Sequence, residues 1–198
     1  MTEKTKTDAS MKSILGPYVE RVQGSGEYLT LGFHPALFPL QERWRNNGLS
    51  ADFLAGYVST FFPGEEPDKG DRQVEVKDAV SFIANELLEN AMKYSSSISH
   101  SIVTIEVFLE IDHVSIYATN SVTDTEIPGF QEHINLLLSG DPSTLYIECL
   151  ERNAQDETED GSGLGYLTML NDYMVTLGWK FETSAGQPTV TTMARLSV

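Results

Sequence analysis

Residues 86–94 read Glu-Leu-Leu-Glu-Asn-Ala-Met-Lys-Tyr and close a segment with clear helical periodicity. Glu86 and Asn90 are four residues apart, so a helix places both side chains on one face, which Lys93 continues. We therefore expect a carboxylate, an amide and an amine to face a cleft while the opposite side of the helix enters the core. The apolar stripe at the i, i+3, i+4, i+7 spacing consists of Val76, Ala79, Val80, Ile83 and Leu87.

The polar face of this helix has the donor types of a magnesium–phosphate site. The side-chain oxygen of Asn90 suits Mg²⁺, which proteins usually hold with few ligands while water and nucleotide phosphates supply the rest. The Glu86 carboxylate can take a proton from a hydroxyl or water, and the Lys93 amine can meet phosphate as a point charge. The alternative is a solvated helix face with an i,i+4 pair, the commoner origin of such a pattern.

A glycine-rich stretch, Gly-Ser-Gly-Leu-Gly at residues 161–165, directly precedes a helix expected over residues 166–173. Glycines let backbone N–H groups approach an anion, and the start of a helix adds its positive dipole, so this pattern favours a phosphate site. A tight loop before a helix is an equally good explanation of the glycines. The acidic residues in 156–160 would repel a triphosphate unless they point outward.

The remaining periodicities predict an α+β fold. Strands alternating with helices in this order give a two-layer α/β sandwich, with a mixed, mostly antiparallel sheet carrying helices on one face. We expect a flexible tail over residues 1–15 and a single domain over residues 16–198, whose front part covers residues 28–73. The expected strands are 28–33, 101–111, 114–119, 179–183 and 189–196. A first helix is expected to start at Ala36 and to end at a turn over 46–48. Further helices are expected over 49–62, followed by a loop over 63–71, and over 130–138.

Composition narrows the classes of ligand. The net charge of −16 disfavours nucleic acid and anionic membranes, and it is compatible with a basic protein partner or a nucleotide accompanied by Mg²⁺. Residues 1–12 lack the apolar core of a signal peptide, and no apolar run approaches the roughly 18 residues of a membrane span, so we expect a cytoplasmic protein. Cys149 is the only cysteine, which excludes an intramolecular disulfide.

Taken together, the two motifs resemble those of the GHKL ATPases. Residues 86–94 look like the N-box of that superfamily and residues 161–165 like its second glycine box, which makes residues 121–160 similar to the ATP lid. The resemblance extends over residues 28–198 by element order, and it implies the Bergerat, or histidine-kinase-like, fold with ATP and Mg²⁺ as ligands. It also implies that Glu86 is the catalytic base, that Asn90 holds Mg²⁺, that Lys93 touches phosphate, and that Gly161, Ser162, Gly163, Leu164 and Gly165 wrap the triphosphate.

One motif of the superfamily is altered. Its first glycine box has an Asp that reads the adenine amino group, followed by a Gly, after the second strand of the central hairpin. Here the strand ends in Asn120 and Ser121, so the glycine is missing. The amide oxygen of Asn120 can still accept a hydrogen bond from the adenine amino group, and we expect it to take this role.

The front of the chain is similar to anti-sigma-factor serine kinases and other switch kinases. The histidines are His34, His100, His113 and His133, and none lies on a long helical hairpin ahead of Glu86, as it would in a sensor histidine kinase. The resemblance implies a serine/threonine kinase that phosphorylates a small regulatory protein, anti-anti-sigma (STAS-like) or sigma-factor-like, in bacterial partner switching. The alternative is a pseudokinase that only sequesters its partner, and a homodimer is compatible with both functions. The third interpretation is an α+β domain whose motifs are accidental.

Overall fold

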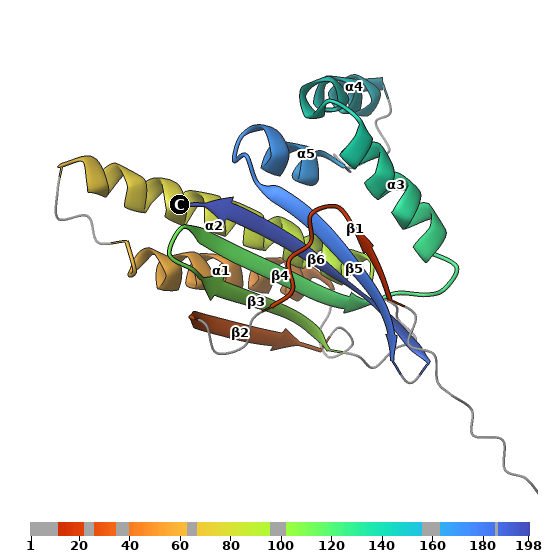
Figure 1. Cartoon of the computed structure of the whole chain (residues 1–198), viewed down its shortest axis with the longest axis horizontal. Coiled ribbons are helices and arrows are strands. Elements are labelled where there is room, and N and C mark those ends of the chain that lie inside the picture. Colours follow the sequence, from red (N-terminus) through yellow and green to blue (C-terminus); the bar gives the residue numbers. More distant parts are fainter. Residues whose placement is uncertain are drawn as a thin grey trace, which may run out of the picture.

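The computed structural model describes residues 12–21, 26–34, 40–62, 67–95, 102–155, 163–184 and 186–198, with the side chains of 40–44, 67–71 and 155 left aside. Within these ranges a six-stranded sheet with the order β1-β5-β6-β4-β3-β2 carries its helices on one face (Figure 1). The strands are β1 (Lys12–Leu15), β2 (Glu27–Phe33), β3 (Val103–Leu109), β4 (His113–Ser121), β5 (Thr176–Ser184) and β6 (Gln187–Ser197). The helices are α1 (Leu40–Ser59), α2 (Pro67–Lys93), α3 (Ile127–Ser139), α4 (Pro142–Gln155) and α5 (Leu164–Asn171).

The sheet confirms the predicted two-layer α+β sandwich. Every strand pairing in the described ranges is antiparallel, so that part of the sheet is antiparallel throughout and not mixed. Side chains along β3 alternate between buried and half-buried, and the register pairs Ile105 with Ala118 and Val107 with Ile116 of β4 on the core face. The strand expected over 101–111 is shorter, since β3 ends at Leu109 and Ile111 lies in the turn after it with 96% of its surface exposed.

The helical layer rests on α2. All members of the predicted stripe from Val76 to Leu87 are buried, because this side of α2 lies on the sheet and on α1. The turn predicted at residues 46–48 is wrong, since α1 continues through it. Packing of Ala51, Leu54 and Val58 in the core outweighs the weak turn preference of the Asn-Asn-Gly sequence. The expected loop over 63–71 is also too long, because α2 begins at Pro67.

The segment between β4 and α5 contains a helix that the sequence analysis did not predict. The expected helix over 130–138 is α3, and α4 follows it after Gly140 and Asp141. One side-chain oxygen of Asp141 accepts hydrogen bonds from the backbone N–H (2.9 Å) and the hydroxyl (2.8 Å) of Thr144, and Pro142 opens the helix. The sequence Asp-Pro-Ser-Thr at residues 141–144 is therefore the start signal of α4. No helix in the described ranges is long and apolar enough to cross a membrane.

The tail predicted over residues 1–15 needs correction at its end. Residues 1–11 lie outside the described ranges, but Lys12–Leu15 form β1, which pairs with the outer side of β5. Residues 16–21 then cross the sheet face opposite the helices (Figure 1). There the Tyr117 hydroxyl donates a hydrogen bond to the Val19 carbonyl (3.0 Å), and Arg21 pairs with Glu106 (2.7 Å). The N-terminal segment thus covers part of the open side of the sheet.

The crossing segment lies so close to β5 that Gly178 has no room for a side chain. A methyl group on Gly178 would stand 2.6 Å from the Cα and 2.7 Å from the amide nitrogen of Tyr18. We expect Gly178→Ala to lower the free energy of unfolding by about 1–3 kcal/mol, the usual cost of overpacking. The control is Gly56→Ala in α1, where a methyl group meets nothing within 4 Å; it should raise stability by roughly 0.5–1 kcal/mol. Urea denaturation measures both, and equal stability of the two variants would contradict the tight crossing.

Candidate functional site

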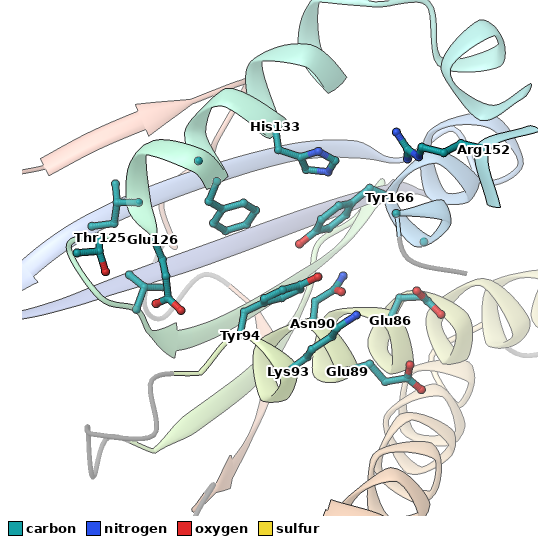
Figure 2. Close-up of a pocket in the computed structure, with 16 residues that line it drawn as sticks. Glu86, Glu89, Asn90, Lys93, Tyr94, Thr125, Glu126, His133, Arg152 and Tyr166 are labelled. Carbon is teal, nitrogen blue, oxygen red and sulfur yellow. The ribbon is translucent and has the colours of Figure 1, made fainter. Parts of the chain in front are cut away.

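A cavity of about 840 Å³ lies where α2, α3, α4 and the start of α5 come together (Figure 2). Its size is within the range of small-molecule and cofactor sites. One wall is the polar face of α2, and the facing wall includes the glycine-rich start of α5. The lining residues are Glu86, Glu89, Asn90, Lys93, Tyr94, Val122, Thr125, Glu126, Ile127, Gly129, Phe130, His133, Arg152, Gly163, Gly165 and Tyr166.

The α2 wall consists of the residues expected from the helical spacing. Glu86, Asn90 and Lys93 all line the cavity, and Figure 2 shows their side chains projecting from one side of α2. The Lys93 ammonium lies 5.4 Å from the centre of the Tyr94 ring, a cation–π distance. Because the buried stripe of α2 fixes its rotation, the polar face can only turn toward the cavity.

The facing wall begins with Gly163 and Gly165. Gly163 has a φ of 99°, a left-handed conformation that other residues adopt only with strain, and it caps the start of α5. A methyl group on Gly165 would lie 2.0 Å from a carboxylate oxygen of Glu86. The Glu86 side chain therefore packs on the backbone of Gly165, and the two sequence motifs meet although they are far apart in the chain.

Not every predicted site residue lies at the cavity. Gly161 and Ser162 lie outside the described residues, as do residues 156–160, and Leu164 is the first residue of α5 but is not part of the lining. Asn120 is buried behind Tyr94, and its amide nitrogen donates to the carbonyls of Tyr94 (3.3 Å) and Ser121 (3.1 Å). The structure thus does not bring Asn120 to the cavity wall, because it belongs to the core-facing side of β4.

Sequence reasoning missed several lining residues. Phe130 and His133 come from α3, Arg152 from α4 and Tyr166 from α5. Figure 2 shows Tyr166 directed toward the α2 wall, and His133 and Arg152 directed toward each other. The Arg152 guanidinium contacts the Cys149 sulfur at 3.4 Å, and it would lie 4.0 Å from a methyl group on Gly163. No pattern in the sequence indicated Arg152 or His133, because their position depends on how the α3–α4 pair folds over the cavity.

Burial and neighbouring charges shift three titratable groups in the cavity. Burial, reinforced by the nearby Glu89 carboxylate, raises the pKa of Glu86 above its ordinary value of 4.5. Burial and the positive charge of Arg152 lower the pKa of His133, which favours its neutral form. Burial also raises the pKa of the Tyr166 phenol. The α2 wall thus holds a carboxylate that retains a proton more readily than an exposed glutamate does.

The residues of the cavity fit a magnesium–nucleotide in chemical type. Asn90 offers a hard oxygen, Lys93 and Arg152 offer positive charge, and Gly163 opens α5 without a side chain. The rings of Tyr94 and Phe130 give the same cavity an apolar, aromatic surface on which a base can stack.

The raised pKa of Glu86 makes the stability of Glu86→Gln depend on pH. In wild type, ionising this carboxylate costs more in the folded than in the unfolded state, so the cost is absent below about pH 4 and complete above the folded-state pKa. We expect Glu86→Gln to melt at a higher temperature than wild type at pH 7, with the gap closing as the pH falls toward 4. Glu75→Gln, an exposed position on the same helix, controls for loss of one negative charge. Equal gains in the two variants at pH 7 would show that Glu86 is not destabilised by burial.

Comparisons with known proteins reveal a relationship at the level of the fold. No protein-family model matches the sequence, and no curated protein matches it. Among solved structures, a chain in the crystal structure of the SiaB–SiaC complex from Pseudomonas aeruginosa superposes with a TM-score of 0.55. The match covers 85% of this chain and 89% of that chain at 16% sequence identity. At this identity the likeness shows that the two chains share an architecture.

Proposed function

We propose that this protein binds a magnesium–nucleotide, ATP in the first place, in the cavity between α2 and α5, and acts as a cytoplasmic serine/threonine protein kinase on a small regulatory protein. The observation that carries the proposal is the convergence of Glu86, Asn90 and Lys93 on the glycine-rich start of α5. Two patterns that are each weak evidence in a sequence gain weight when they form the opposite walls of one cavity.

Each group has a defined task in this proposal. The Asn90 oxygen binds Mg²⁺, while Lys93 and Arg152 lie where they can neutralise phosphate charge. Bound Mg²⁺–ATP supplies the phosphoryl group and the metal charge that stabilises its transfer. Gly163 keeps the N-cap position of α5 free of a side chain, so that backbone N–H groups and the helix dipole can face the phosphates.

Glu86 is the proposed general base. Its pKa is raised by burial, which moves it toward the pH at which a carboxylate exchanges protons efficiently. Its carboxylate touches Gly165, so it lies beside the place where the terminal phosphate would meet the start of α5. A serine or threonine hydroxyl entering from the open side could then transfer its proton to Glu86 as it attacks.

The comparison with solved structures supports a protein partner. The similar chain belongs to a complex of two proteins, SiaB and SiaC. The resemblance of the two motifs to GHKL switch kinases favours a bacterial partner-switching role, with an anti-anti-sigma-like or sigma-factor-like protein as the target. The net charge of −16 further favours a target with a basic contact surface.

A second candidate is a pseudokinase that binds its partner without phosphoryl transfer. Two observations favour it. The first glycine box is altered at Ser121, and the amide nitrogen of Asn120 is engaged with the carbonyls of Tyr94 and Ser121 behind the cavity wall. Because Asn120 does not line the cavity, an adenine base bound there would depend on stacking.

Glu86→Gln separates the two candidates. Gln keeps the size of Glu86 but cannot accept a proton from a hydroxyl. We expect wild type to bind Mg·ATP and transfer phosphate, whereas Glu86→Gln keeps the affinity and loses transfer by a factor on the order of 10² to 10⁴. Calorimetry gives the affinity. Phosphate transfer is measured with labelled ATP and two acceptors. One acceptor is the partner protein, first identified by affinity pull-down, and the other is water.

The outcomes are distinct. Wild type that binds Mg·ATP and its partner yet transfers no phosphate supports the pseudokinase. Transfer that survives in Glu86→Gln keeps the kinase and removes Glu86 as its base. Wild type that binds no nucleotide refutes both the base and the cavity assignment.

A further inference from the structure

The outer side of α4 presents apolar side chains that nothing in the described part of the chain covers. Ile147 and Leu150 are 56% and 43% exposed and stand three residues apart, so they lie on one side of the helix. Cys149 and Arg152 occupy the inner side, toward α5 and the cavity. We call Ile147 and Leu150 the lid face.

The surroundings of the lid face are acidic. Residues 122–155 carry six carboxylates, of which Glu126 lines the cavity while Glu148 and Glu151 lie on α4. The basic groups in the same stretch are His133 and Arg152, and both line the cavity on the inner side. Glu148 and Glu151 are exposed beside Ile147 and Leu150 on α4. The lid face is therefore apolar with a negative rim, and the cations of this stretch point away from it.

The negative charge around the lid face decides which kind of molecule can bind there. A second copy of the chain would bring its own excess of negative charge, and nucleic acid or an anionic membrane would bring phosphates, so each is repelled. A protein segment with apolar side chains flanked by Lys or Arg meets both the apolar surface and the rim. We propose that the lid face docks a basic amphipathic segment, most simply a helix, of the protein partner.

The position of the lid face gives this docking a link to the cavity. Figure 1 shows α3 and α4 beyond the edge of the sheet, next to α5, and the inner sides of both helices line the cavity. A partner on the outer side of α4 would thus hold the helix that carries Arg152. The inference deepens the proposed function by giving the chemistry of its partner, but it rests on residues outside the cavity.

A designed peptide tests the proposal in the absence of nucleotide. The probe is a fluorescein-labelled helix of about 18 residues made of Leu and Lys in an amphipathic pattern, and its binding is followed by fluorescence anisotropy. We expect the double variant Ile147→Ser/Leu150→Ser to bind at least about tenfold more weakly than wild type. Leu49→Ser removes a side chain that is 60% exposed on α1 and is the matched control, with unchanged affinity. Glu148→Gln/Glu151→Gln should weaken binding and flatten its dependence on salt.

Three results would overturn the proposal: equal loss of affinity in the α4 variants and in Leu49→Ser, equal binding of a Leu–Glu peptide of the same pattern, or a wild-type dimer in sedimentation that Ile147→Ser/Leu150→Ser dissociates. The glutamine variant alters exposed charges alone, so it decides the question if the serine variant fails to fold. Because the assay contains no nucleotide, its failure is distinguishable from a failure of the cavity to bind Mg·ATP.

Discussion

The carboxylate of Glu86 lies against the bare backbone of Gly165, and this contact joins the two sequence motifs at the site. Any side chain at residue 165 would meet the carboxylate and force it or the start of α5 to move. Without one, α5 approaches the polar face of α2 and closes one end of the cavity. The apolar side of α2 is packed on the sheet, so the helix cannot rotate to relieve the contact. Core packing thereby fixes a polar, partly buried carboxylate at a glycine-rich helix start.

The strongly periodic parts of the fold could be predicted from the sequence. The stripe from Val76 to Leu87 and the alternation along β3 each repeat one burial pattern, so local spacing is sufficient to assign them. The turn expected at residues 46–48 was wrong because burial of Ala51 and Leu54 keeps α1 continuous. The strand at Lys12–Leu15 was missed because a short, largely exposed edge strand depends on its partner β5, which spacing alone does not reveal.

The candidate site likewise contains residues that local spacing predicts and residues that depend on long-range packing. Glu86, Asn90 and Lys93 could be assigned to one face from helical spacing, and the structure brings that face to Gly163 and Gly165. His133 and Arg152 reach the cavity only through the folding of α3 and α4 over it, a long-range arrangement without local periodicity. Asn120 sits on the core-facing side of its strand, where its amide serves backbone carbonyls instead of the cavity.

The central claim is that Asn90 lets the cavity bind a nucleotide together with Mg²⁺, and calorimetric titration with ATP, with and without Mg²⁺, tests it most directly. Asn90→Ala should lose at least about tenfold of the Mg²⁺-dependent affinity while the protein remains folded. Gln73→Ala, on the same helix and outside the cavity lining, should titrate like wild type, since its side-chain amide bonds to the Ser59 carbonyl of α1. Unchanged Mg·ATP affinity in Asn90→Ala, or no binding of ATP by wild type, would contradict the account.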